Sequence, residues 1–172
     1  SGSGLDGLSW ETAFHDVAEA LLSSSSGDQI WVKEGVYDCT LTLRSGVGVF
    51  GGFAGNETTS EFHLRDWSLN RTIINLIRSR DHAVDSVNTT DSQLDGIEFR
   101  FQERILAAFV YEGFGGRASI DNCTIVDINP QNHGGTLIIP FGIHVRIKNT
   151  LMVRKSPTTS GSIIAVGEHF NS

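Results

Sequence analysis

A degenerate internal repeat is the feature that most limits what this chain can fold into. Three six-residue segments, beginning at Leu94, Ile120 and Ile147, share one pattern: an apolar residue, a charged residue, Asn or Gly, a small or apolar residue, any residue, and an apolar residue. Their starts lie 26 and 27 residues apart, and steps of 25 and 26 residues back lead to similar segments at Leu69 and Leu43. A nearly constant step of this size is typical of chains built from stacked structural units.

A second apolar run accompanies each unit, about half a unit away. These runs begin near residues 82, 107, 137 and 163. We therefore expect at least two short strands per unit, with a bend where Asn or Gly tolerates left-handed backbone angles. Such a unit cannot bury its own apolar face, so the repeat predicts a parallel β-solenoid of about five coils. A β-sandwich or jelly roll is the alternative, but it predicts hairpin turns every ~8–12 residues instead of a constant step.

One amphipathic helix is predicted before the repeats. Apolar residues from Trp10 to Leu21 follow the i, i+3, i+4, i+7 spacing of a single helical stripe. Ser9 is a suitable N-cap, and the serines before Gly27 end the pattern. We expect a helix over residues 9–22, preceded by a linker or arm over residues 1–8 and contained in a single domain over 9–172.

Composition and charge exclude two classes of partner. The chain has 172 residues, with 13 basic and 20 acidic side chains and a net charge of −7. Binding to nucleic acid without sequence specificity needs a basic surface, which this composition does not supply. The chain also has no run of ~18 apolar residues that would span a membrane. Cys39 and Cys123 would lie about three coils apart, so both thiols are expected to be free and semi-buried.

Several segments resemble right-handed β-helix proteins of the pectin-lyase-like superfamily. Residues 27–37, Gly-Asp-Gln-Ile-Trp-Val-Lys-Glu-Gly-Val-Tyr, resemble the opening coil of these proteins. Residues 51–58, Gly-Gly-Phe-Ala-Gly-Asn-Glu-Thr, are similar to the glycine-rich loop of bacterial secreted and surface members. Residues 10–22 resemble the helix that caps their N-terminal end, and residues 120–125 resemble their inner-strand repeat. The resemblance implies an all-β, right-handed parallel β-helix with an N-terminal capping α-helix, outside the cell, and it leaves the reaction open.

Two aspartates are candidate ligands for calcium. Asp95 and Asp121 occupy the same position in consecutive units, so both carboxylates are expected to reach one Ca²⁺ ion, which prefers oxygen ligands. The resemblance implies a similar site, because lyases of the superfamily bind calcium between neighbouring coils and use an arginine as base. Arg117 and Arg146 are the nearest such residues in the repeat. A pair of solvated surface aspartates is the alternative, and no other cofactor is indicated.

The sequence contains no catalytic cluster that we can assign, so no catalytic residue is named. His82 lies between Asp81 and Asp85, but on a strand it would point away from both, whereas a polygalacturonase-type site needs clustered acids with a histidine. Neither a Gly-x-Ser-x-Gly nor a His-Glu-x-x-His motif occurs. Trp67 and Tyr111 are candidates for stacking on sugar rings, with packing at the core or its rim as the alternative.

Asn-x-Ser/Thr sequons occur at Asn56, Asn70, Asn88 and Asn122. They favour a glycosylated extracellular protein, and the alternative is that they match by chance in a chain rich in Asn, Ser and Thr and carry no glycan. Asn122 also shares its repeat position with Asn149, so a ladder of hydrogen-bonded asparagine side chains is the alternative role there.

These observations predict a non-catalytic extracellular structural protein, glycosylated, that forms a β-helix subunit of a surface stalk, adhesin or head-to-tail filament. No cap is recognisable after the last apolar strand at residues 162–167, so we expect either another copy of the chain or further coils of a longer chain to cover it. One alternative is a calcium-assisted polysaccharide lyase or its truncated N-terminal part. Another is a carbohydrate-binding module with a polysaccharide as its ligand.

Overall fold

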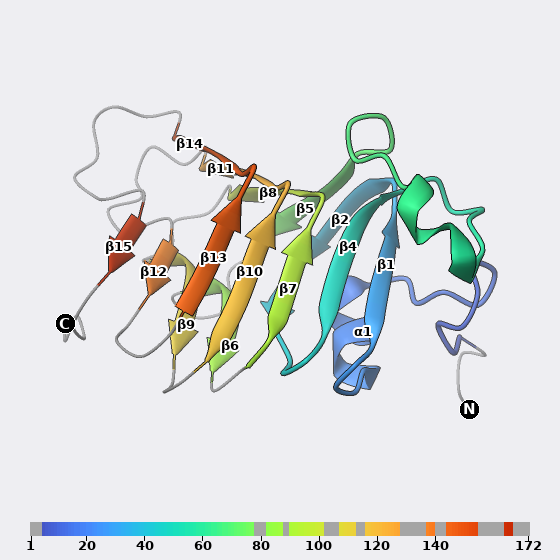
Figure 1. The fold of residues 1–172 in the computed structure, drawn as a ribbon, viewed down its shortest axis with the longest axis horizontal. Helices are drawn as coiled ribbons and strands as arrows, with labels where there is room; N and C mark the ends of the chain where they lie inside the picture. Colours follow the sequence, from blue (N-terminus) through green and yellow to red (C-terminus); the bar gives the residue numbers. More distant parts are fainter. Residues whose placement is uncertain are drawn as a thin grey trace.

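The computed structural model describes residues 5–77, 82–87, 90–101, 107–112, 116–127, 137–139, 144–154 and 164–166. Within these residues, short strands form three parallel sheets of five strands each (Figure 1). The first sheet contains, in spatial order, β1 (Gln29–Lys33), β4 (Gly48–Phe53), β7 (Ser92–Asp95), β10 (Arg117–Asp121) and β13 (His144–Lys148). The second contains β2 (Gly35–Cys39), β5 (Thr72–Leu76), β8 (Ile97–Phe101), β11 (Thr124–Asp127) and β14 (Leu151–Arg154). The third contains β3 (Leu41–Thr42), β6 (His82–Val87), β9 (Ala107–Glu112), β12 (Leu137–Ile139) and β15 (Ile164–Val166).

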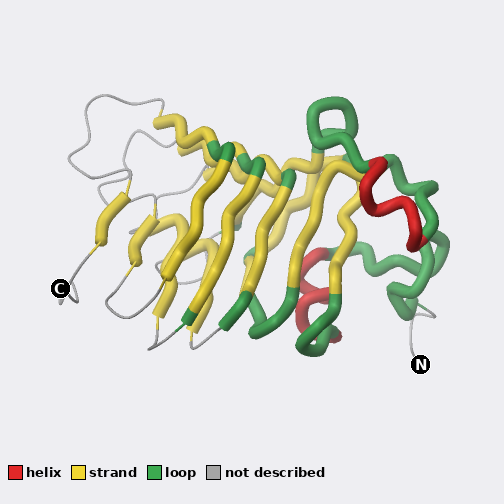
Figure 2. Tube along the Cα trace, viewed as in Figure 1, coloured by secondary structure: helices red, strands yellow, loops and turns green. Residues whose placement is uncertain are grey.

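The chain visits the three sheets in turn, so each strand pairs with the strand three positions further along. Figure 2 shows this arrangement, with the strands of the first sheet side by side across the front of the molecule. Along β5 and β8, buried and half-buried residues alternate, which is the period expected of strands with one face on the core. Fully buried apolar side chains from neighbouring strands, such as Leu94, Phe99 and Ile120, form this core.

The structure corrects the expected fold class. The sequence predicts one all-β, right-handed parallel β-helix with a constant step near 26 residues, whereas the structure shows separate five-stranded sheets, an α-helix and a 3-10 helix. Thr72 pairs with Ile97 at the predicted step, but Gly35 pairs with Thr72, 37 residues later. The additional residues lie between β4 and β5 and include the 3-10 helix η1 (Thr59–Leu64). A repeated pattern of strand residues does not predict such an insertion. The stalk, adhesin and filament subunit depended on a regular solenoid, and the structure gives no support for them.

The helix before the sheets is shorter than predicted. Helix α1 covers Val17–Ser23 instead of residues 9–22, and its N-cap is Asp16, whose carboxylate accepts a hydrogen bond from the Ala18 amide at 2.8 Å. It packs against β1, β2 and β3 at one end of the sheets (Figure 1). Its buried residues Val17 and Leu21 belong to the core, so only the C-terminal half of the predicted apolar stripe lies in a helix that packs on the core.

Trp10 explains why the helix begins late. Its indole nitrogen donates to the Glu57 carbonyl at 2.9 Å, and its ring lies 5.8 Å from the ring of Phe53. These tertiary contacts hold Trp10 away from the helix axis. Ser9, the predicted N-cap, does make the hydrogen bond of an N-cap, because its hydroxyl accepts from the Thr12 amide at 3.3 Å, but residues 11–12 form a turn and no helix follows directly.

Candidate functional site

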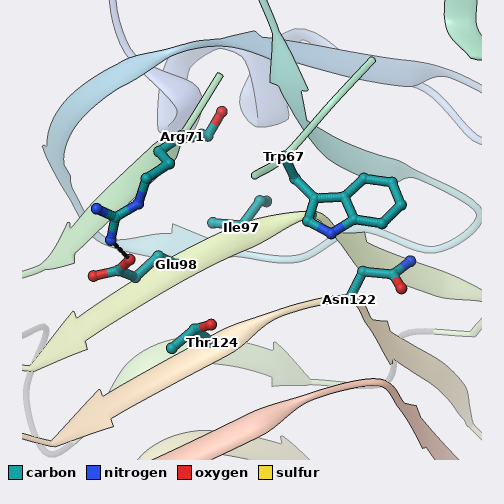
Figure 3. A pocket seen from close by; sticks show the side chains of 8 residues that line it. Trp67, Arg71, Ile97, Glu98, Asn122 and Thr124 are labelled. Carbon is teal, nitrogen blue, oxygen red and sulfur yellow. Dashed lines mark hydrogen bonds and ion pairs between the residues drawn. The ribbon is translucent and has the colours of Figure 1, made fainter. Parts of the chain in front are cut away.

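A cleft lies where the segment after η1 passes over the second sheet (Figure 3). It is open to solvent, and its cavity volume is about 150 Å³. Its residues come from three consecutive units and from the inserted segment, so the cleft exists only in the folded chain. They are Trp67, Arg71, Thr72, Gly96, Ile97, Glu98, Asn122 and Thr124.

Glycine lets the inserted segment lie close to the first sheet, and this contact positions Trp67. Gly52 has a φ of +93°, and a Cβ atom there would lie 2.8 Å from the Trp67 amide nitrogen. The Gly52 carbonyl accepts a hydrogen bond from the Asp66 amide at 2.8 Å. Gly51 and Gly52 are thus part of strand β4, whereas the family resemblance implied a glycine-rich loop. A side chain at Gly52 would push Trp67 away from the cleft.

Arg65 packs against the Trp67 ring and also binds strand β7 of the next unit. Its guanidinium carbon lies 5.1 Å from the centre of the Trp67 ring and 4.8 Å from that of Phe62. The same group forms an ion pair with Asp95 at 2.9 Å and donates to the Gly51 carbonyl at 3.1 Å. Because both side chains of the ion pair are buried, this contact fixes the inserted segment to the sheet.

A small charged cluster forms the opposite side of the cleft. The Glu98 carboxylate accepts hydrogen bonds from Arg71 of the preceding unit and from Arg100 on its own strand. Burial alone would raise the pKa of Glu98, but the hydrogen bonds from the two guanidinium groups lower it by more, so the pKa lies below its ordinary value of 4.5. Glu98 is therefore ionised at neutral pH and lies beside two cations.

The turns beneath the cleft repeat from one unit to the next. Gly96, Asn122 and Asn149 occupy equivalent positions and have φ values of 71°, 53° and 48°. The Asn149 amide donates to the Asn122 side-chain oxygen at 3.1 Å, and the Asn122 amide donates to Asp95 at 3.0 Å. The positive φ values confirm the predicted left-handed bend, and the hydrogen bonds confirm the predicted asparagine ladder.

The two candidate calcium ligands are neighbours, as the repeat predicts, but they are not solvated. Asp95 and Asp121 pair across β7 and β10 and are 7% and 4% exposed, so the alternative of surface aspartates is wrong. Asp95 is bound by Arg65, and Asp121 by Arg146. The second carboxylate oxygen of Asp121 has no hydrogen-bond partner among the described residues. No group of three metal-ligating side chains is found in the described part of the chain, and calcium binding stays a prediction.

The residues predicted to stack on sugar rings or to carry glycans lie in different parts of the structure. Trp67 lines the cleft and is 41% exposed. Tyr111 lies in β9, but its side chain is outside the described residues. Asn56 is exposed, Asn70 is half-buried with its amide donating to Gly52, and Asn88 lies outside the described residues.

Both cysteines are free, as predicted, and both are more buried than predicted. Burial is the main reason that the pKa of each thiol is raised to about 12, for Cys39 and Cys123 alike. Such thiols are almost fully protonated at neutral pH. They are poor nucleophiles and poor metal ligands in the folded protein.

Sequence reasoning missed the charged side of the cleft and the arginine that packs on Trp67. Arg65, Arg71 and Glu98 come from separate segments, and no local motif contains them. The one available signal is that Arg71 occupies the repeat position of Gly96 and Asn122, since Thr72 pairs with Ile97. An arginine at a bend where the following units have Gly or Asn indicates that the surface there is charged.

Comparison of the chain with protein-family models, curated proteins and solved structures found no match. The resemblance to the pectin-lyase-like superfamily therefore remains a prediction. Among the described residues, no helix has both the length and the apolar character needed to cross a membrane.

Proposed function

We propose that this chain is a non-catalytic structural protein, a rigid scaffold of stacked parallel sheets. The observation that carries the proposal is the state of three carboxylates among the described residues, each of which is bound by an arginine side chain from another strand or segment. A general acid or base must exchange a proton with its substrate, and an ion pair buried against another segment opposes that exchange. The pairs are Asp95 with Arg65, Asp121 with Arg146, and Glu98 with Arg71 and Arg100.

The ion pairs also explain how separate units become one body. Arg65 connects the inserted segment to β7, Arg71 connects the second unit to β8, and Arg146 connects β13 to β10. Each of these three pairs joins segments that are distant in the sequence. The charged residues thus stabilise the stacking of units, which is the task of a scaffold.

A calcium-assisted lyase is the second candidate, and a single observation favours it. Asp95 and Asp121 lie side by side, and one buried oxygen of Asp121 has no hydrogen-bond partner among the described residues. Carboxylate oxygens are suitable ligands for Ca²⁺. Arg146, a nearest arginine in the repeat, is held in the ion pair with Asp121, so it would have to leave that carboxylate to act as a base.

Incubation of the whole chain with polygalacturonate and Ca²⁺ separates the two candidates. We expect no unsaturated product by ultraviolet absorbance and no new reducing ends. We expect Asp121→Asn to lower the melting temperature, because Arg146 loses its ionic partner. Product that appears with the wild-type chain and disappears with a folded Asp121→Asn variant would overturn the scaffold proposal and establish the lyase.

A further inference from the structure

We propose that the cleft between Trp67 and β8 binds a neutral oligosaccharide built from hexose units. This inference goes beyond the scaffold role, and it concerns a binding site that needs no catalytic step. It rests on a rigid exposed indole, on hydrogen-bonding groups that face it, and on the charge balance of those groups. Each of the three is a property of described residues.

The exposed indole provides an apolar platform. Trp67 is 41% exposed, although a tryptophan side chain offers a large apolar area whose burial would stabilise the fold. Its backbone is held against Gly52, and its ring packs on the guanidinium of Arg65, so little conformational entropy remains to be lost on binding. A pyranose ring presents a face of C–H groups that matches such a platform.

The opposite side of the cleft provides paired hydrogen-bonding groups. Figure 3 shows Arg71 and Glu98 in contact on one side of Ile97, and Trp67 on the other side. The Arg71 side chain is 56% exposed, so it can donate further hydrogen bonds, and the Glu98 carboxylate can accept them. A sugar hydroxyl both donates and accepts, so neighbouring hydroxyls on one ring can use a carboxylate and a guanidinium at once.

The charge balance argues for a neutral ligand. Glu98 is only 15% exposed and is bound by both Arg71 and Arg100. An acidic sugar would compete with Glu98 for Arg71 and would leave a largely buried carboxylate with weaker pairing, which is costly. A cationic ligand would meet the two guanidinium groups. Hydroxyls gain hydrogen bonds on this surface without breaking the ion pairs.

The cleft is small and open, which fits part of a ligand and not a whole one. Its cavity volume of about 150 Å³ lies below the roughly 300–1,000 Å³ that is typical of sites enclosing a whole small molecule. Because the cleft is open, neighbouring units of an oligosaccharide can extend beyond it along the surface. We therefore expect the cleft to hold one ring of a longer chain.

Titration with neutral hexasaccharides tests the proposal. The whole chain is titrated with cellohexaose, laminarihexaose and mannohexaose, and binding is followed by calorimetry and by the NMR signals of the indole N–H groups. At least one of these neutral probes should bind and shift the signal of Trp67 more than those of Trp10 and Trp31. Trp67→Leu should weaken binding by about tenfold or more. Leu69→Ala is the matched control, because Leu69 is 77% exposed and does not line the cleft, and it should leave binding unchanged.

Two further variants keep the test decisive if Trp67→Leu does not fold. Trp67→Phe retains an aromatic ring and should retain most of the binding, whereas Glu98→Gln should weaken it without loss of the fold. The proposal is overturned if none of the neutral probes binds or if Trp67→Leu binds as the wild type does. It is also overturned if hexagalacturonate binds more tightly than all neutral probes, or if the shifted indole is that of Trp10 or Trp31. The scaffold proposal is judged separately, by the absence of product formation.

Discussion

Arg65 and Asp95 form an ion pair at 2.9 Å, with only 8% and 9% of their side chains exposed. Arg65 belongs to the segment inserted between β4 and β5, and Asp95 ends strand β7. The pair therefore fixes a segment that breaks the repeat to the unit that follows it. Trp67, two residues after Arg65, is held over the cleft by the same contact.

Removal of one partner of this pair should strongly destabilise the fold. Arg65→Met leaves the Asp95 carboxylate buried without its cation, and we expect the free energy of unfolding to fall by about 3 kcal/mol. Urea unfolding followed by circular dichroism measures the change. Arg71→Met is the matched control, because Arg71 is more than half exposed and Glu98 keeps Arg100, so about 1 kcal/mol or less is expected. Equal losses in the two variants would contradict the structural role of Arg65.

Substitution of Asn122 should reveal its left-handed backbone. Asn122 has a φ of 53°, which glycine adopts freely and alanine adopts at a cost of roughly 1–2 kcal/mol. Asn122→Gly and Asn122→Ala both lose the ladder contacts with Asp95 and Asn149. We expect the alanine variant to be less stable than the glycine variant by about 1 kcal/mol in urea unfolding. Equal stability of the two would show that the bend is not strained.

The buried thiols should make stability fall at high pH. The pKa of Cys39 and of Cys123 is raised from the ordinary 9.0 to about 12. Above pH 9 the unfolded chain releases these protons while the folded chain keeps them, so the free energy of unfolding decreases between pH 9 and 12. Thermal unfolding across this range measures the slope. A Cys39→Ala, Cys123→Ala double variant should show a shallower slope, and an unchanged slope would assign the effect to other groups.

The same thiols should be protected from reagents in the folded chain. Because both are buried and protonated at neutral pH, a thiol reagent such as iodoacetamide should modify them only after unfolding. Mass spectrometry with and without urea measures the number of modified cysteines. Rapid modification of Cys123, which is 1% exposed, in the native protein would contradict the described packing.

Glycan occupancy should differ between two of the sequons. Asn56 is exposed in the turn after β4, whereas the Asn122 amide nitrogen, the atom that a glycan would modify, donates to Asp95. After expression in a eukaryotic secretory pathway, peptide mapping should find glycan at Asn56 and none at Asn122 in the folded protein. Asn56→Gln provides the control for the assignment. Glycan at Asn122 in folded protein would show that the ladder is dispensable.

Some features of this protein were predictable because they depend on residues close together in the sequence. The bend at Asn122 and Asn149 follows from the backbone freedom of asparagine, and the pairing of Asp95 with Asp121 follows from the step between their units. The burial of alternate residues in β8 follows from the period of a strand. In each case a local preference and the packing of the chain agree.

Other features depended on contacts between distant segments, and the sequence could not predict them. The helix was predicted from residue 9, but Trp10 packs against Phe53 and donates to the Glu57 carbonyl, and α1 begins only at Val17. The constant step failed between Gly35 and Thr72, because the inserted segment has no counterpart in other units.

The sequence by itself therefore determined the strands, their bends and the position of the paired aspartates, since these follow from the conformational preferences of neighbouring residues. Only the tertiary structure decided where the charges lie. No sequence pattern predicts the ionic partners of Arg65, Arg71 and Glu98. An ion pair depends on the distance between two side chains in the folded protein, and it requires no fixed spacing in the sequence. The cleft beside Trp67 exists for the same reason: an insertion that interrupts the repeat folds back onto the sheets.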